Sequence, residues 1–170
     1  MLGMFLAIFK KKKWDENLYR INQRFLKDKK TYSNFDNTAP HLIIWSSSFK
    51  NSKAYFQSKP LSINTHGVRE WVDLYPLVES VRIPEALDYY KSAGLSLSKY
   101  FSNKNYALRS LILNLIKIYF YKNIKGSSYI SIKKHIIFNL IYPSIYYGFF
   151  YFFLRKIFRI LSKIKFKFIK

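Results

Sequence analysis

The sequence predicts a mostly helical α/β fragment, with a mixed region at the front of the chain and long helices after it. Three observations lead to this fold class. Apolar residues recur at helical spacing from residue 69 onward, the β-type runs fall before that point, and no acidic residue follows Asp88. A chain of 170 residues with 49% apolar side chains has the size and core material of one domain with an appendage.

The front of the chain begins with an apolar run at residues 2–9, which we interpret as a buried strand or the end of a helix. This run is too short to cross a bilayer. Its apolar part also precedes the charges, which is the reverse of the order in a signal peptide. The lysines at 10–13 are expected to form a solvated loop, and a short helix is expected around residues 14–25.

Residues 36–49 are typical of a capped helix that is largely buried. The three residues 36–38 are types that cap helix N-termini, and Pro40 suits a first turn. After this helix we expect a strand over residues 53–63 with a break at Pro60.

The pattern becomes helical from Arg69. Pro84 is expected to open a second helix that ends at Gly94. A long helical stretch over residues 98–122 and a linker over 122–128 are expected to follow. The first of these helices is predicted from apolar residues at positions i, i+3, i+4 and i+7: Trp71, Leu74, Tyr75 and Val78.

The last part of the chain predicts membrane contact. Residues 136–154 carry no formal charge and have about the length of a bilayer-spanning helix, although they include many tyrosines, which prefer the membrane interface. Residues 155–170 then hold seven cations among Ile and Phe, which is typical of a basic amphipathic helix lying in the interface of an anionic membrane. The alternative is a pair of core helices followed by a solvated basic terminus.

The charge of the chain is strongly segregated. The net charge is +21, and residues 89–170 hold 16 Lys and Arg and no acid. Such a half predicts an anionic partner, which could be a membrane surface, a nucleic acid or a phosphorylated substrate. Nucleic acid is not favoured, because the cations stand beside long aliphatic runs and do not line a hydrophilic groove.

The sequence contains no complete nucleotide or metal motif. It has no cysteine, which excludes disulfides and thiolate metal sites, and it has no P-loop, G-x-G-x-x-G, G-x-S-x-G, H-E-x-x-H or Asp-x-Asp motif. The histidines at positions 41, 66 and 135 are not spaced as ligands on one helix. No metal ligand is therefore assigned in this chain.

Two clusters remain as candidates for chemistry. The first runs from Asp36 to His41, where a carboxylate at a helix N-terminus could serve as a general base; the alternative is an ordinary N-cap. The second comprises His66, Arg69 and Trp71. Its His and Arg could clamp a diphosphate while the tryptophan anchors the loop; the alternative is a surface loop with a helical ion pair.

Three motifs follow one another in the front part of the chain: LGMFLAIFKKKKWDE, YSNFDNTAPHLIIWSSSF and KAYFQSKPLSINTHGVREW. Their order resembles the C-terminal part of bacterial glycosyltransferase family 2 proteins, including abequosyltransferase-like members that build lipopolysaccharide and capsule glycans. They match an apolar strand that ends near a basic residue and Trp14, a helix that opens with Pro-His at 40–41, and a strand that ends in Lys-Pro-Leu at 59–61. The resemblance covers roughly residues 1–110.

The resemblance implies that residues 1–95 are the acceptor-side half of a GT-A-like domain, residues 96–128 a helical connector, and residues 129–170 membrane-associating helices. In the family, the nucleotide-binding half carries the Asp-x-Asp motif and binds a nucleotide-sugar donor with a divalent metal. Neither that half nor a cofactor site is recognised here, so the chain is expected to be truncated or split and inactive alone.

The same resemblance implies roles for the candidate residues. Asp36 would deprotonate the acceptor hydroxyl, while His66 and Arg69 would stabilise the leaving diphosphate, with His41 and Trp71 in the substrate- and diphosphate-binding region. The implied partners are a complementary N-terminal half, a glycan or lipid-linked acceptor, and the anionic cytoplasmic face of a bacterial inner membrane, bound peripherally or by a single span. The alternative is a membrane-surface anchor or interaction protein without chemistry.

Overall fold

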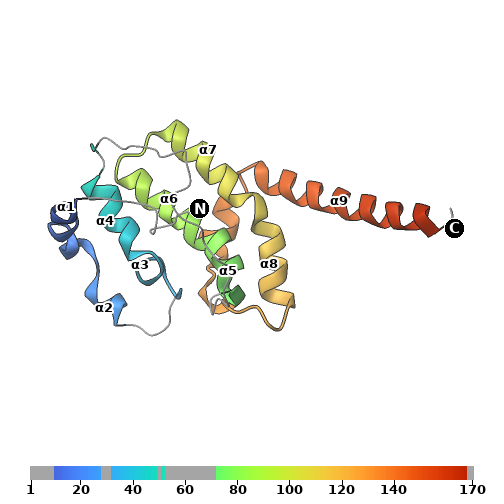
Figure 1. Cartoon of the computed structure of the whole chain (residues 1–170), viewed down its shortest axis with the longest axis horizontal. Helices are drawn as coiled ribbons and strands as arrows, with labels where there is room; N and C mark the ends of the chain where they lie inside the picture. The colour runs from blue at the N-terminus through green and yellow to red at the C-terminus, as the bar shows by residue number, and fades with distance from the viewer. Residues whose placement is uncertain (1–9, 28–31, 50, 53–71, 168–170) are drawn as a thin grey trace.

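The structure is a computed structural model that describes residues 10–27, 32–49, 51–52 and 72–167. Within these ranges the chain is built from helices, and no strand occurs (Figure 1). The prediction of a mostly helical chain is therefore confirmed. The two predicted β-type runs, at residues 2–9 and 53–63, lie outside the described residues.

Three short helical elements stand at the front of the described chain, where the sequence predicts a loop and one helix. The expected loop is wrong for residues 11–13, which are helical, and the expected helix over 14–25 is broken. Asparagine side chains explain the breaks, because they bond to nearby backbone: Asn17 donates to the Lys13 carbonyl (2.9 Å) and Asn22 accepts from the Arg24 amide (3.1 Å). The elements are α1 (Lys11–Asp15), η2 (Leu18–Arg20) and α2 (Gln23–Leu26).

The next two helices are α3 (Phe35–Thr38) and α4 (Pro40–Ser48). Pro40 opens α4 as predicted, and the apolar residues that follow it are buried. The predicted capping role of Asp36 is wrong. The side chain of Asn34 caps α3 by accepting the Asn37 amide at 2.9 Å, so Asp36 lies within the first helical turn.

A long central helix is assembled from several kinds of turn. Its first part does not follow the predicted stripe: Tyr75 is 50% exposed, whereas Leu77 and Val81 are fully buried. A uniform spacing of 3.6 residues fails here because turns of different pitch succeed one another. The elements are η3 (Val72–Leu74), α5 (Tyr75–Leu77), the π-helical turn η4 (Val78–Arg82) and α6 (Ile83–Ser92).

Pro84 accounts for the widened turn ahead of it. Proline lacks an amide hydrogen and its ring crowds the carbonyl four residues earlier, which disfavours a regular α-helical turn. The π-helical turn relieves this crowding, since the Ile83 amide bonds to the Val78 carbonyl five residues back. Pro84 therefore lies in the first turn of α6, as predicted, and α6 continues directly from the π-helical turn before it.

The end of α6 is the C-cap that the sequence predicts. Gly94 has φ of 106°, in the left-handed region that glycine tolerates. Its amide donates to the Lys91 carbonyl (3.0 Å), and the Leu95 amide donates to the Tyr90 carbonyl (2.8 Å). This pair of bonds is a Schellman motif, which satisfies the last carbonyls of the helix.

The remaining helices follow the predicted order. The long stretch expected at 98–122 consists of three consecutive elements, and a non-helical linker follows it. In sequence, the elements are α7 (Leu97–Ala107), η5 (Leu108–Ser110), α8 (Leu111–Phe120), η6 (Ser127–Tyr129), the π-helical turn η7 (Ile132–Ile136), η8 (Ile137–Asn139) and α9 (Ser144–Lys167).

The core is divided into small clusters arranged around the central helix. Ala86 of α6 packs with Leu42 of α4, while Val81 of η4 packs with Ile118 of α8. A third cluster joins η5, α8, the turn before α9 and the base of α9: Leu108, Leu111, Tyr142 and Ile145. The central helix therefore carries α4 on one part of its surface and α8 on another.

A buried polar cluster reinforces the contact between α6 and α7. Lys104 is only 6% exposed, and its amine donates to Asp88 and to the Tyr100 hydroxyl (3.0 Å). The Tyr100 hydroxyl also donates to Asp88 (2.7 Å). Burial and the hydrogen bond with Tyr100 raise the pKa of Tyr142, which joins the cluster from the turn before α9. These bonds satisfy a lysine that would be costly to bury alone.

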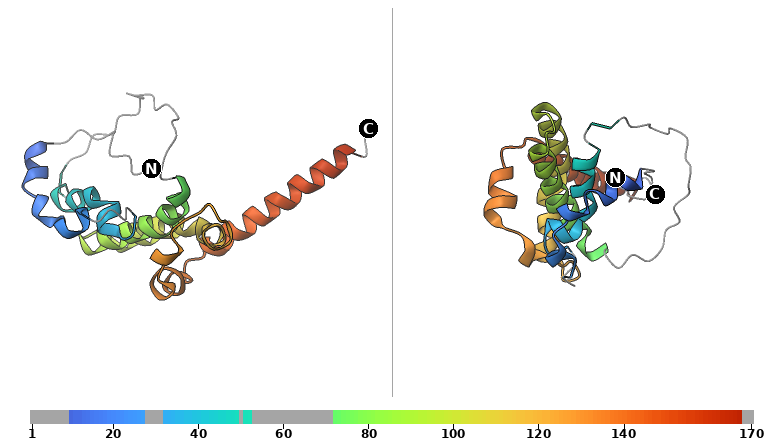
Figure 2. Two further views of the ribbon diagram at one scale, coloured as in Figure 1. Left: turned by 90° about the horizontal axis from the view of Figure 1, so that it is seen from below. Right: turned by 90° about the vertical axis from the view of Figure 1, so that its left-hand side faces the viewer.

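The helix α9 extends away from the rest of the molecule (Figure 1; Figure 2). The predicted single helix over residues 136–154 is wrong, because the chain turns between η8 and α9. Among the described residues, no single helix has the length and apolar character needed to cross a membrane. One bent pair, residues 132–139 with 144–159, meets these criteria together, with a bend of 82°.

The base of α9 packs so closely on η5 that position 148 has no room for a side chain. A methyl group added to Gly148 would lie 2.0 Å from the Arg109 carbonyl oxygen. The obstacle is backbone, which cannot rotate away as the end of a side chain could. Gly148 therefore allows α9 to leave the body at its observed angle.

We predict that Gly148→Ala lowers the free energy of unfolding by about 1–3 kcal/mol, because the added methyl group forces α9 and η5 apart. Denaturant titration followed by circular dichroism measures the change. Tyr147→Ala on the same helix is the control, since Tyr147 is 72% exposed, and it should change stability by less than about 0.5 kcal/mol. Equal effects in the two variants would contradict the close contact.

Candidate functional site

Asp36 is half-buried on α3, and its carboxylate lies within the electrostatic field of residues far away in the sequence. Burial raises the pKa of Asp36, and the negative charge of Glu85 raises it further. The positive charge of Lys134 acts in the opposite direction and lowers it. A carboxylate with a raised pKa in a partly buried position is better suited to accept a proton than an ordinary surface aspartate.

His41 lies in the first turn of α4, also half-buried. Burial lowers its pKa, which favours the neutral imidazole at neutral pH. A neutral imidazole can donate or accept one hydrogen bond at each nitrogen, but it does not supply a positive charge to a diphosphate. A neutral His41 would therefore offer hydrogen bonds but no positive charge.

Glu85 is the centre of a buried polar network that the sequence did not predict. Its side chain is 9% exposed, and three groups bond to its carboxylate. Arg82 donates to Oε2 at 2.5 Å, while Lys134 (2.6 Å) and His135 (3.1 Å) lie against Oε1. Burial alone would raise the pKa of Glu85, but hydrogen bonds from His135 and Lys134 and the charge of Arg82 outweigh it and lower the pKa to about 2.

The hydrogen-bond roles of the two ring nitrogens of His135 follow from their partners. The Ser131 amide donates to Nδ1 at 2.9 Å, so Nδ1 acts as the acceptor. Nε2 is then the nitrogen that donates to Glu85, at 3.1 Å.

Arg82 connects the network to the segment that carries Asp36. Its guanidinium donates to the carbonyl of Tyr32 from Nε (3.1 Å) and Nη2 (3.0 Å), and to that of Ser33 from Nη2 (2.7 Å). Tyr32 has φ of 71°, an uncommon conformation for a residue other than glycine. The start of α3 is thus held by the central helix, which fixes the distance between Asp36 and Glu85.

Two π-helical turns supply the groups that donate to Glu85. Arg82 ends η4, and Lys134 and His135 lie in η7. Such turns are uncommon and are frequent at functional sites, because the extra residue redirects a side chain out of the regular helical stripe. Here the two π-helical turns place side chains from distant segments of the chain against the Glu85 carboxylate.

The described structure includes only some of the site residues that the sequence predicts. Asp36 and His41 lie on successive helices, and the structure adds the Glu85 network beside Asp36. His66, Arg69 and Trp71 lie outside the described residues, so the predicted diphosphate clamp stays a prediction. One signal could have revealed part of the network: Arg82 and Glu85 stand three apart around a proline, in the last acidic stretch of the chain.

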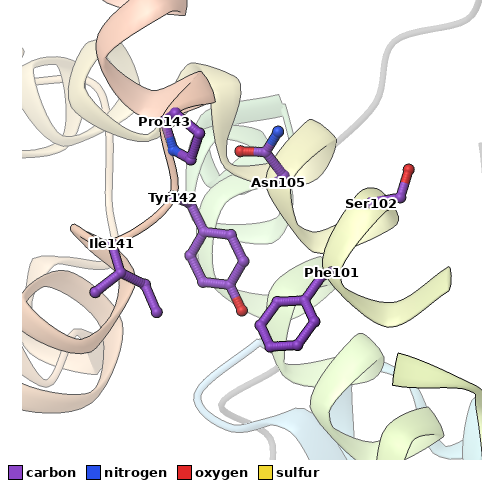
Figure 3. A pocket seen from close by; sticks show the side chains of 6 residues that line it. All are labelled: Phe101, Ser102, Asn105, Ile141, Tyr142 and Pro143. Atoms are coloured by element: carbon purple, nitrogen blue, oxygen red, sulfur yellow. The ribbon is translucent and has the colours of Figure 1, made fainter. Parts of the chain in front are cut away.

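A separate hollow lies between α7 and the turn before α9 (Figure 3). Its volume is about 350 Å³, and the rings of Phe101 and Tyr142 line it with centroids 6.2 Å apart. Ser102 and Asn105 supply polar groups, but the Asn105 side chain already accepts the Ser144 amide (3.0 Å). No residue predicted from the sequence as a site residue lines this hollow.

No group of three or more His, Asp or Glu side chains within the described ranges could hold a metal ion. Comparisons of the chain with protein-family models, with curated proteins and with solved structures found no match.

We predict that Glu85→Gln lowers the free energy of unfolding by about 3 kcal/mol at pH 7, because the buried Arg82 loses its counter-charge. In the wild type, the stability contributed by Glu85 is present above pH 4.5 and is lost as the pH falls toward about 2, since the unfolded chain binds the proton more readily. The variant should lack this acid-dependent loss. Unfolding measured by circular dichroism across this pH range tests both parts.

The matched control for this prediction is Glu16→Gln. Glu16 also faces a lysine, but at 3.9 Å and in an exposed position, where ion pairs contribute little. We expect the control to leave both the stability and its acid dependence close to those of the wild type. Similar profiles for the two variants would mean that the Glu85 network does not stabilise the fold.

Proposed function

We propose that this chain is the acceptor-side region of a family 2-like glycosyltransferase that works at an anionic membrane surface. The observation that carries the proposal is the placement of Asp36, a half-buried carboxylate whose pKa is raised by burial and by Glu85. The motif series around it resembles that family in its order. Its substrate would be a nucleotide-sugar donor, and its acceptor a glycan or lipid-linked glycan of the cell surface.

In the proposed reaction, Asp36 accepts the proton of the acceptor hydroxyl as that oxygen attacks the anomeric carbon of the sugar. A new glycosidic C–O bond forms, and the bond between the anomeric carbon and the diphosphate oxygen breaks. The electron pair of the broken bond leaves with the nucleoside diphosphate. Arg69 and His66 would donate hydrogen bonds to that departing charge, and His41 would orient a substrate group through a neutral imidazole.

The Glu85 network would serve this chemistry by holding and tuning the base. Arg82 bonds to the backbone ahead of α3 and so keeps Asp36 at a fixed place. The ionised Glu85 raises the proton affinity of Asp36, which moves its pKa toward the working pH of a general base.

We further propose that the mixed region at the front of the chain belongs to a GT-A-like α/β domain. The strands that this fold needs would include residues 2–9 and 53–63. The nucleotide-binding half, with its divalent metal, would be supplied by a separate segment.

The proposal predicts the outcome of a transfer assay in which this chain is combined with a nucleotide-binding half of the family. Asp36→Asn and Arg69→Ala should each lower kcat/KM by about 100-fold or more, because one removes the base and the other a charge that binds the leaving group. The control variant is Asp73→Asn, which removes a carboxylate that lies outside the cluster and should leave kcat/KM close to the wild-type value. Wild-type rates in both site variants would place the chemistry elsewhere.

The pH dependence of the same assay tests the role of Asp36 more directly. Lys134 lowers the pKa of Asp36, so Lys134→Met should raise that pKa and move the acid limb of kcat/KM to higher pH. Lys133→Met is the matched control, since Lys133 is the neighbouring lysine and its amine lies over the Phe138 ring, 5.9 Å from the ring centroid. An acid limb that stays in place in Lys134→Met would contradict Asp36 as the base.

A second candidate function is attachment to a membrane surface without catalysis. The observation that favours it is the exposure of α9, whose aromatic residues project from the body and are followed by cations. Vesicle flotation of the full chain, combined with an inactive transfer assay in the complemented system, would favour this candidate over the first.

A further inference from the structure

Two exposed apolar surfaces adjoin one another near the end of the chain. The first lies on η7, η8 and the turn after them, where large apolar side chains are 54–73% exposed: Ile132, Ile137, Phe138 and Ile141. The second lies on α9, where Tyr146, Phe150 and Phe153 are 45–62% exposed. The Tyr146 hydroxyl donates to the Leu140 carbonyl at 2.9 Å, which joins the first turn of α9 to the turn before it.

The apolar residues of the first surface all lie on its outer side. His135, Asn139 and Tyr142 point into the body, at positions i, i+4 and i+7, and they are 5–7% exposed. The side chains between them therefore face away from the body. Nothing in the described part of the chain covers them.

The helix α9 has two distinct sides. At its base, Ile145 and Gly148 face the body, and continuing this side along the helix by steps of three and four residues leads to Phe152, Arg155 and Arg159. The opposite side carries Tyr146, Phe150, Phe153 and Ile157 at the same steps. The side that packs on the body thus becomes the basic side farther out, and the apolar side points away from the body.

The positive charge of this part of the chain indicates which kind of partner covers the two apolar surfaces. Residues 89–170 hold 16 Lys and Arg and no acid, so two copies of this region would repel each other. An apolar helix side flanked by cations fits the interface of a bilayer that contains anionic lipids. The aromatic side chains also suit that depth, because their rings prefer the boundary between headgroups and acyl chains.

We propose that α9 and the η7–η8 turn form one membrane-contact surface, which places α9 parallel to the plane of an anionic bilayer with the helical body on the water side. Phe150, Phe153 and Ile157 enter the acyl region together with Phe138 and Ile141. The side with Arg155 and Arg159 faces the headgroups and water. This inference refines the membrane location in the proposed function and rests on that location, but it requires no sugar transfer.

The orientation can be tested with single tryptophans in the full chain. Phe150→Trp and Phe138→Trp report on the two parts of the proposed surface, and Phe152→Trp is the matched control on the basic side of the same helix. The three variants are mixed with vesicles of phosphatidylglycerol and phosphatidylcholine that carry bromine at a shallow acyl position. The quenching of wild-type fluorescence, from the native tryptophans, is subtracted in each case.

We expect binding to these vesicles and much weaker binding to vesicles of phosphatidylcholine alone, because the cations need anionic headgroups. We also expect quenching at positions 150 and 138 to exceed that at 152 by about twofold or more. The measurement is repeated with vesicles that carry bromine near the bilayer centre. Equal quenching at positions 150 and 152 in these vesicles would show a spanning helix and overturn the proposal. Absence of vesicle binding, or concentration-dependent dimers that shield position 150 without lipid, would also overturn it. Transfer activity toward a soluble acceptor would be unaffected by these failures, which separates them from failure of the enzyme proposal.

Discussion

The burial of one carboxylate is the constraint on which much of the described structure depends. Glu85 lies on the central helix with a pKa lowered to about 2, and it stays ionised there because three donors surround it. Since each donor comes from a particular place, the burial of Glu85 requires η7 to pack against α6 and Arg82 to reach the backbone ahead of α3. The segment ahead of α3, the central helix and η7 are thus joined by bonds to a buried charge and to the arginine beside it, in addition to the apolar contact of Phe35 with α6.

The division of the core explains why polar contacts have this importance. The described apolar clusters are small, and none of them spans α3, α6 and η7 together. The network around Glu85 and the cluster around Lys104 stand between these apolar groups and connect them. The observed packing of the helices satisfies these buried groups, which would be costly to leave without partners.

Local sequence chemistry predicted part of this structure and missed the rest for physical reasons. Pro40 at a first turn and Gly94 at a C-cap were predictable, because each depends on the backbone preferences of one residue. The partners of Glu85 were not, since Lys134 and His135 lie 49 and 50 residues away and meet it only through tertiary packing. Asp36 was identified as a candidate base, but its environment depends on that same distant carboxylate.

The missing side chain at Gly148 has a mechanical consequence. From this contact to the end of α9 at Lys167 the helix is about 28 Å long, since each residue adds about 1.5 Å. A rotation of α9 by about 10° about its contact with the Arg109 carbonyl would therefore move the far end of the helix by about 5 Å. Backbone packed against backbone resists such rotation, and this rigid joint would hold the body at a set height and tilt above any surface on which the helix lies.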